Sequence, residues 1–258
     1  MRITVQRYLL LIRLVDNMPV YSIAGLNVEF KSRYSLIERK CIEYLSELDA
    51  PADVTVYATD EDLRRERLSS SKDFSDEYIE SICLYRNFCF QILKYEGLLL
   101  HSSVVSVGDR GIAFLARSGV GKSTHTLFWK KLLGDKITIV NGDKPIVRFC
   151  EGLPVAFGTP WGGKEGLQTN TNVELTDLCF IERSETDSVE VLDVKDAVDL
   201  IMHQVLLPSE PIDVATTLEL TDKLLKKCRL WRVKCTPNIS AAKVAYNALF
   251  GEEYETKI

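Results

Sequence analysis

From Gly97 onward the chain alternates short apolar runs with helical patterns. The apolar runs are separated by glycine and acidic turns, as is typical of strands in a covered sheet, and they occupy residues 98–107, 111–116, 137–140, 146–149, 178–181 and 189–192. Apolar residues recur at helical spacing over residues 122–133, 194–206, 213–227 and 239–250. The pattern therefore predicts an α/β (mixed α+β) fold with a mixed sheet.

The first part of the chain is richer in strands. β-branched and aromatic residues bounded by turn signals predict strands over residues 7–15, 20–30 and 53–58. Helical spacing favours one helix over residues 35–48 and another from an N-cap at Asp76 to Gly97. The charged, serine-rich residues 60–76 indicate an exposed loop or a weak boundary, with charges that form a solvated face or, alternatively, a docking surface.

This change of pattern predicts two parts: an N-terminal strand-and-helix region, residues 1–97, and a core, residues 98–258. The N-terminal region is either a docking module or extra sheet that completes the fold. Within the core, the basic residues at the end of the 213–227 helix are interpreted as its exposed face, where positive charge suits the helix dipole: Lys223, Lys226, Lys227 and Arg229.

The composition is that of a globular protein. Its 258 residues, 46% of them hydrophobic, suffice for a full core. The formal net charge is −5 and the charges are interleaved, so the chain has no basic stripe, which argues against nucleic acid as a partner. No stretch approaches the roughly 20 apolar residues that cross a bilayer, so no membrane partner is expected.

The cysteines favour a reducing compartment. The chain has seven, scattered, without a CxxC pair and mostly in apolar runs, which indicates buried thiols in place of disulfides or zinc ligands. The apolar run at residues 8–12 is short for a signal peptide, Arg13 interrupts it, and no small-residue cleavage site follows. We therefore expect a cytoplasmic protein.

A glycine-rich loop at residues 116–124 carries the strongest chemical signal. It lies between a predicted strand and a predicted helix, which is the context of a phosphate-binding loop with the pattern G-x-x-x-x-G-K-[ST]. Its glycines let several backbone N–H groups point at one anion, and the helix adds its positive dipole end. The sequence thus predicts a triphosphate site formed by Arg117, Ser118, Gly119, Val120, Gly121, Lys122, Ser123 and Thr124.

Within this loop, Lys122 is expected to reach the β- and γ-phosphates and the Ser123 hydroxyl to ligate Mg²⁺. One position departs from the pattern, because Ala116 occupies the place of the first glycine. The competing interpretation is a coincidental glycine-rich turn that caps a structural helix. The complete S-G-x-G-K-S-T segment in the right context favours the phosphate loop.

Together with three other features, the loop resembles the HPr kinase and phosphoenolpyruvate carboxykinase superfamily, in particular its shorter HPr-kinase-like proteins. His101 stands at a strand upstream of the loop, Asp143 follows the next strand, and residues 158–166 (Gly-Thr-Pro-Trp-Gly-Gly-Lys-Glu-Gly) look like the motif of the HPr-kinase-like subgroup. The resemblance covers roughly residues 98–250. It implies a P-loop fold of that superfamily and an ATP-dependent transfer of phosphate to a hydroxyl.

The resemblance also assigns roles. Where the family has two adjacent aspartates, this chain has Gly142-Asp143-Lys144, so that either the first or the second is replaced. The resemblance implies that Asp143 binds the metal together with Ser123 and accepts the proton of the acceptor hydroxyl. Glu165 is expected to assist, and Lys164 to close over the γ-phosphate.

Each candidate also has a structural interpretation. Asp143 alone resembles a turn aspartate, and His101 could either hold the γ-phosphate or tune Asp143, or be a hydrogen-bonded histidine at a strand end. Lys164 and Glu165 could be solvated surface residues. His125 and His203, inside predicted helices, are interpreted as structural.

The sequence therefore favours a kinase with ATP and Mg²⁺ as cofactors and a hydroxyl acceptor that is a peptide, a protein or a small molecule. The absence of an N-K-x-D motif favours ATP over GTP. The alternative is a non-catalytic ATP-binding module for docking or regulation, because of Gly142. A homo-oligomer is left open.

Overall fold

The computed structural model describes residues 19–46 and 51–251 and divides them into two units between Tyr95 and Glu96. The start of the chain and the strand expected over residues 7–15 lie outside the described residues. The first unit contains a three-stranded sheet, and the second contains a nine-stranded mixed sheet covered by helices. The chain is thus a mixed α/β protein.

The first unit is built on β1 (Val20–Ile23), β2 (Leu26–Lys31) and β3 (Val54–Tyr57). β1 and β2 form an antiparallel hairpin whose turn residues, Ala24 and Gly25, both have positive φ (54° and 72°), as a type I′ turn requires. β3 pairs in parallel with β2, and helix α4 (Asp76–Gln91) packs against β3. Phe88 of α4 meets Phe30 edge to face at 6.3 Å.

The prediction of an exposed loop over residues 60–76 is wrong for most of this segment, because Asp60–Ser69 form helix α3. Thr59 begins the helix with a capping box: its hydroxyl accepts from the Asp62 N–H and the Asp62 carboxylate accepts from the Thr59 N–H. Only Glu66 of this helix is buried, and it pairs with Arg86. A helix with so little apolar surface gives no periodic hydrophobic signal.

Other boundaries in the first unit also differ from the prediction. The helix expected over residues 35–48 is only α2 (Leu36–Lys40), followed by the 3₁₀ turn η1 (Ile42–Tyr44). The N-cap of α4 is Ser75, whose hydroxyl accepts from the Tyr78 N–H, and not Asp76. A short 3₁₀ helix, η2 (Ile92–Tyr95), follows α4 and ends the first unit.

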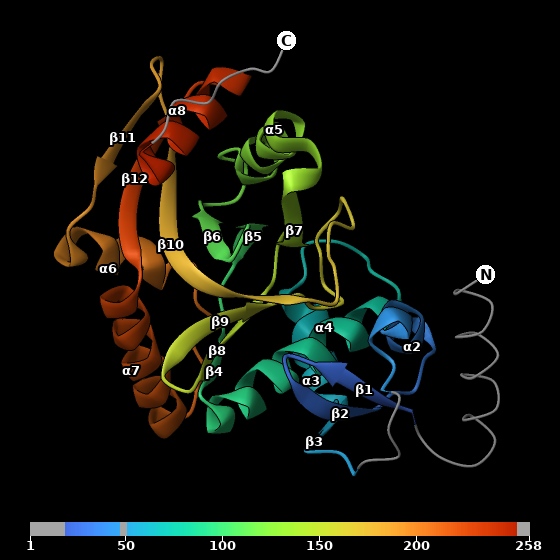
Figure 1. Cartoon of the computed structure of the whole chain (residues 1–258). Helices are drawn as coiled ribbons and strands as arrows, with labels where there is room; N and C mark the ends of the chain where they lie inside the picture. Colours follow the sequence, from blue (N-terminus) through green and yellow to red (C-terminus); the bar gives the residue numbers. More distant parts are fainter. Residues whose placement is uncertain (1–18, 47–50, 252–258) are drawn as a thin grey trace. The chain divides into compact units, whose positions relative to one another are not determined.

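The second unit is organised by one long strand, β10 (Asn172–Arg183), drawn in gold in Figure 1. Its first residues pair antiparallel with β9, and its later residues pair in parallel with β6 on one side and β12 on the other. A register shift between Leu175 and Asp177 marks the change. The sheet therefore bends along β10 and consists of two groups of strands that share it.

The strand order is β4-β8-β9-β10-β6-β5-β7, with β12 beside β10 and β11 beside β12. The strands are β4 (Gly97–Leu99), β5 (Ser102–Val107), β6 (Arg110–Leu115), β7 (Ile137–Asn141), β8 (Ile146–Cys150), β9 (Leu153–Phe157), β11 (Ser188–Val191) and β12 (Arg229–Cys235). The expected strand over residues 98–107 is broken at Leu100 and His101, and the sequence patterns missed β9 and β12.

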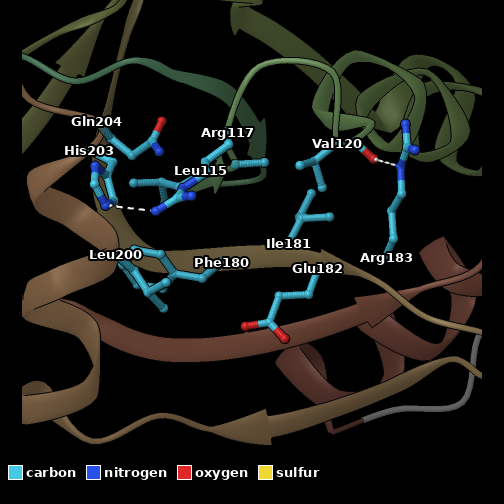
Figure 2. Close-up of a pocket in the computed structure, with 11 residues that line it drawn as sticks. Leu115, Arg117, Val120, Phe180, Ile181, Glu182, Arg183, Leu200, His203 and Gln204 are labelled. Carbon is cyan, nitrogen blue, oxygen red and sulfur yellow. Dashed lines mark hydrogen bonds between the residues drawn. The ribbon is translucent and has the colours of Figure 1, made fainter.

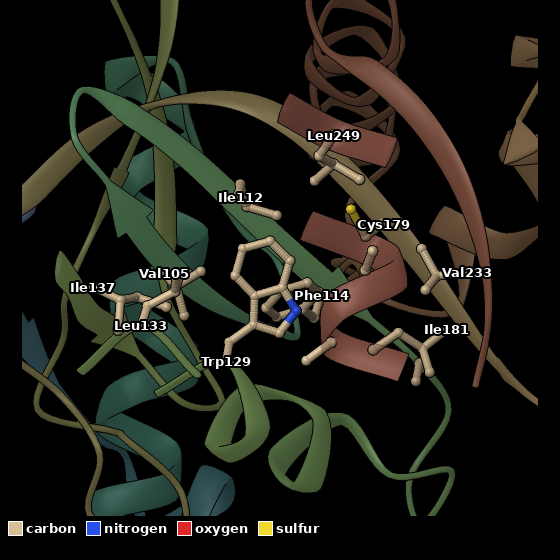
Figure 3. Packing of buried hydrophobic residues seen from close by; sticks show 13 residues of the cluster. Val105, Ile112, Phe114, Trp129, Leu133, Ile137, Cys179, Ile181, Val233 and Leu249 are labelled. Carbon is tan, nitrogen blue, oxygen red and sulfur yellow. The ribbon is translucent and has the colours of Figure 1, made fainter. Parts of the chain in front are cut away.

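Four helices complete the second unit: α5 (Lys122–Leu133), α6 (Val194–Met202), α7 (Pro211–Lys227) and α8 (Ile239–Phe250). α5 and α8 cover one face of the sheet, where Trp129 of α5 is fully buried among side chains of β6, β10 and β12 (Figure 3). Phe114, Cys179 and Val233 reach this face from those three strands. This core fixes the start of α5 against the end of β6, and the glycine-rich loop lies between them.

A buried carboxylate connects the three parallel strands. Asp177 of β10 is fully buried and accepts hydrogen bonds from Arg110 of β6 (2.9 Å) and from Arg229 (2.9 Å) and Trp231 (2.8 Å) of β12. Arg229 is exposed, as predicted, but its assignment to the end of a helix is wrong, since α7 ends at Lys227 and Arg229 begins β12. Its half-exposed guanidinium pairs with the buried Asp177 carboxylate.

None of the seven cysteines, all within the described residues, forms a disulfide; five are buried and two, Cys150 and Cys235, are half-buried. None of the helices in residues 19–46 and 51–251 combines the length and the apolar character that a membrane span requires.

Replacing Asp177 by alanine is expected to lower the free energy of unfolding by about 1–3 kcal/mol, because Arg110, Arg229 and Trp231 lose the buried acceptor that they share. The measurement is urea denaturation followed by circular dichroism. Asp222→Ala is the matched control: Asp222 forms an exposed pair with Lys226 on α7, and its loss changes stability by less than about 0.5 kcal/mol. Equal effects of the two substitutions would contradict this account of the sheet.

Candidate functional site

A cavity of about 560 Å³ opens in the second unit where β6 gives way to α5. It is lined by residues of the glycine-rich loop, of the turn after β7 and of the segment 158–166: His101, Arg117, Ser118, Gly119, Gly121, Lys122, Ser123, Thr124, Asp143, Lys144, Gly163, Lys164 and Glu165. The structure thus brings together every site residue predicted from the sequence except Val120, which lies on the outer side of the loop and lines two neighbouring pockets.

The loop has the backbone that its glycines predict. Gly119 and Gly121 have φ of +82° and +125°, conformations that side chains rarely adopt. Ala116 is buried in the core below the loop and is not among the described residues with positive φ, so glycine is not needed there. The departure from the motif at Ala116 therefore leaves the curl of the loop intact.

Arg183, at the end of β10, holds the loop from outside the cavity. Its Nε donates to the Val120 carbonyl at 2.9 Å, as Figure 2 shows, and its terminal nitrogen donates to the Gly119 carbonyl. These two carbonyls are therefore bonded on the side of Arg183, and within the loop the Val120 N–H donates to the Arg117 carbonyl at 3.2 Å. The same figure shows an apolar pocket of about 320 Å³ beside the loop, where Arg117 contacts His203 Nε2 at 2.9 Å.

Lys122 is the first residue of α5 and its side chain is only 10% exposed. Its ammonium makes no hydrogen bond within the described residues, and its nearest charged partner is Asp143 Oδ1 at 3.7 Å. Burial lowers the pKa of Lys122 to about 8, against the opposite effect of Asp143. A buried cation with so little compensation is suited to receive an anion.

Asp143 lies in a turn that the Asn141 side chain organises. Asn141 is fully buried at the end of β7, and its Oδ1 accepts from the N–H groups of Asp143 (2.9 Å) and Lys144 (2.7 Å). Its Nδ2 donates to the carbonyl and the hydroxyl of Thr159 (3.1 and 3.2 Å). The turn is therefore joined to the start of the segment 158–166.

His101 is fixed by the break between β4 and β5. The residues on either side of it bond to the turn that carries Asp143. The Leu100 N–H donates to the Pro145 carbonyl, and the Ser102 N–H donates to the Asp143 carbonyl. The His101 N–H itself donates to the Gln204 carbonyl at 2.7 Å. These bonds hold His101 Nε2 at 3.2 Å from Asp143 Oδ1. The strand break that the sequence pattern missed is what brings the imidazole to the carboxylate.

The surrounding cations keep Asp143 ionised. Burial on its own would raise the pKa of this carboxyl, but the hydrogen bond with His101 and the charges of Lys144 and Lys122 outweigh it, so the pKa lies below its ordinary value. Asp143 is thus a carboxylate at neutral pH, available to accept a proton or to bind a cation.

Gly142 is packed closely against the loop that follows. Its N–H donates to the Leu167 carbonyl at 2.6 Å, and a Cβ at this position would lie 3.1 Å from the carbonyl oxygens of Gly162 and Leu167. Gly163 approaches equally closely, because a Cβ there would lie 2.9 Å from the Asp143 Cβ. A side chain at position 142 would push away the loop that carries Lys164 and Glu165.

The remaining histidines do not line the cavity. His125 is buried under Phe114, accepts a hydrogen bond from Trp129 Nε1 (3.0 Å), and has a pKa that burial lowers to about 4. His203 contacts Arg117 of the loop. Both positions agree with a structural role.

Within the described residues, no group of three or more His, Cys, Asp or Glu side chains is placed to hold a metal ion. Ser123 and Asp143 nevertheless line the same cavity and supply one hydroxyl and one carboxylate. Mg²⁺ commonly uses one or two protein carboxylates and completes its shell with water and substrate phosphates, so this donor set fits an ion that arrives with a phosphate ligand.

Sequence reasoning did not find Asn141, Arg183 or Lys144. Asn141 precedes glycine, which signals a turn, but its links to Thr159 depend on tertiary structure. The role of Arg183 could not be predicted from the sequence, because it depends on the pairing of β10 with β6. That pairing brings the Arg183 guanidinium to the Val120 carbonyl of the loop. Lys144 was noted only as the replacement for an aspartate.

Comparisons with known proteins add little. No family model matches the chain, and no curated protein matches it. Among solved structures, the Hpr(Ser) kinase/phosphatase from Coxiella burnetii is a weak neighbour, with a TM-score of 0.28, 10% sequence identity, and coverage of 50% of this chain and 97% of that chain. A similarity at this level does not establish the family, so the resemblance inferred from the motifs stays a prediction.

Placing an aspartate at position 142 is expected to destabilise the protein. Gly142→Asp should lower the free energy of unfolding by about 1–3 kcal/mol, because its side chain meets the carbonyls of Gly162 and Leu167. Lys144→Gln, on the other flank of Asp143, is the control: that side chain is 44% exposed, no carboxylate is added beside Asp143, and the change should stay within about 0.5 kcal/mol. Thermal unfolding of the two variants would contradict the packing argument if Gly142→Asp were as stable as Lys144→Gln.

Proposed function

We propose that the chain is a kinase that binds ATP in the cavity between β6 and α5 and transfers the γ-phosphate to a hydroxyl. The observation that carries the proposal is that a glycine-rich loop, a buried lysine and an ionised aspartate converge on one cavity. An anion cradle beside a carboxylate is the minimum that phosphoryl transfer to a hydroxyl requires.

The phosphates are held by the loop. N–H groups of the loop other than that of Val120, which donates to the Arg117 carbonyl, bind the anion together with the positive end of α5, and Lys122 neutralises the β- and γ-phosphates. Lys164 and Glu165 line the same cavity from the segment 158–166. Lys164 closes over the transferring phosphoryl group, where a cation offsets the charge on its oxygens.

The acceptor is activated at Asp143. The acceptor oxygen forms a bond to the γ-phosphorus, the bond from that phosphorus to the bridging oxygen of ADP breaks, and the hydroxyl proton passes to Asp143. His101 orients the carboxylate by its contact with Oδ1. Because the transition state of phosphoryl transfer is loose, a carboxylate of lowered pKa suffices as the base.

Ser123 and Asp143 are the residues that would hold Mg²⁺. The ion supplies charge neutralisation between the β- and γ-phosphates. The acceptor is a peptide, a protein or a small alcohol, and we propose the N-terminal unit as its docking module.

A second candidate is a non-catalytic ATP-binding module. The close packing at Gly142 favours it, because this position cannot carry a second carboxylate without moving the loop. In that case ATP binding only stabilises a docking conformation. Transfer of label from ATP separates the two candidates.

Replacing Asp143 by asparagine should reduce phosphate transfer by about 10²–10⁴-fold, since the amide cannot accept the proton. The measurement is transfer of ³²P from γ-labelled ATP to a panel of hydroxyl-bearing peptides, proteins and small alcohols. Asp135→Asn, an exposed aspartate outside the cavity, is the control and should act as wild type. A protein that binds ATP but labels no acceptor, and whose Asp143→Asn variant behaves as wild type, would refute the kinase and support the binding module.

Nucleotide binding should take up a proton above pH 8. The pKa of Lys122 is about 8 in the ligand-free protein, and adjacent phosphates favour the ammonium form and raise it. Affinity for ATP is therefore highest at pH values below 8, where Lys122 is protonated, and falls as the pH rises above 8. Calorimetry at pH 8.5 in buffers of different ionisation enthalpy measures the uptake. Lys122→Met should abolish it, and uptake that persists in this variant would assign the proton to another group.

A further inference from the structure

Two pockets flank the phosphate loop, on either side of Arg183. One is the apolar pocket of Figure 2. The other, here called the Thr124 pocket, has a volume of about 370 Å³ and lies at the carboxyl ends of β10 and β12 beside α5. Its lining is Val120, Gly121, Thr124, His125, Phe128, Ile181, Arg183, Ser184, Cys235, Thr236 and Pro237.

The direction of the phosphate chain in the cavity follows from Lys122. The lysine of a phosphate loop reaches the β- and γ-phosphates, and Lys122 Nζ lies 3.7 Å from Asp143 Oδ1, so the γ end lies at Asp143. The other end must leave along the first turn of α5. Thr124 is the last residue of α5 that lines the cavity.

Of the two flanking pockets, the Thr124 pocket continues from that end. It shares Gly121 and Thr124 with the phosphate cavity, whereas the apolar pocket shares only Arg117, at the start of the loop. A group attached to the α-phosphate therefore enters the Thr124 pocket as it passes Thr124.

The chemistry of the pocket suits a neutral, flat ring. Arg183 and Phe128 supply a planar guanidinium and an aromatic ring, both of which stack on bases. The guanidinium is held in place by its bonds to the Gly119 and Val120 carbonyls. His125 and Cys235 bring no charge, because burial lowers the pKa of His125 to about 4 and raises the pKa of Cys235 to about 12.

On this basis, which rests on the proposed function, we propose that the nucleoside of the bound nucleotide occupies the Thr124 pocket and that this pocket selects adenine over guanine. The Watson–Crick edge of guanine presents two adjacent N–H donors, which a carboxylate satisfies and which are costly to bury unpaired. No carboxylate lines the pocket within the described residues. The hydroxyls of Ser184 and Thr236 can donate or accept, as the amino group and ring nitrogens of adenine require.

The test compares ligands with and without a nucleoside. Binding of inorganic tripolyphosphate, ATP and GTP, each with Mg²⁺, is measured by calorimetry for wild type, for Ser184→Trp, which fills the Thr124 pocket, and for Leu200→Trp, which fills the apolar pocket. Tripolyphosphate reports the phosphate cavity alone and shows that each variant is folded.

Wild type is expected to bind ATP at least about tenfold more tightly than tripolyphosphate and than GTP. Ser184→Trp should bind tripolyphosphate as wild type does and lose the advantage of ATP, while Leu200→Trp should behave as wild type. Retention of that advantage in Ser184→Trp, its loss in Leu200→Trp, or equal affinities for ATP and GTP would overturn the inference and leave the phosphate site in place. A wild-type protein that binds neither tripolyphosphate nor ATP would refute the proposed function itself.

Discussion

The buried amide of Asn141 joins the segments on which the cavity depends. It accepts two N–H groups of the turn that carries Asp143 and donates to Thr159 at the start of the glycine-rich segment. An aspartate in its place could accept but not donate, and each buried group left unpaired would cost about 1–3 kcal/mol. The Thr159 hydroxyl, in turn, donates to the Lys144 carbonyl. Together with the backbone bonds of Leu100 and Ser102, this side chain holds the turn that carries Asp143 against the segment that carries Lys164 and Glu165.

The sequence predicted the elements whose hydrophobic pattern is strong. Helix α5 has the predicted bounds, 122–133, because its apolar face packs on the sheet around Trp129. β12 was missed because arginine and lysine alternate with its apolar residues, and those charges are satisfied by partners such as Asp177, which no local pattern shows. α3 was missed for the opposite reason, since it buries almost nothing and its signal is the capping box at Thr59.

The residues of the candidate site also fall into those that a local sequence pattern predicts and those that depend on tertiary structure. The loop could be predicted because its backbone alone demands glycine at positions 119 and 121, and its sequence signature is local. The convergence of His101 and Asp143 could be expected only from a resemblance, since it depends on the strand break at Leu100 and on bonds between segments about 40 residues apart in the sequence. Arg183 is even further from the loop in the sequence, and no sequence motif marks it, because it acts by bonding to the backbone of another segment.

The contact of Arg183 with the loop has a consequence for the thermodynamics of binding. Arg183 bonds to the Gly119 and Val120 carbonyls, and these bonds restrict the backbone of the loop without any contribution from an anion. Part of the conformational entropy of this segment is therefore lost when the chain folds and not when a ligand binds. The loop is thus a preorganised receptor, and the cost of ordering it lowers its affinity for an anion less than it would for an unrestrained loop.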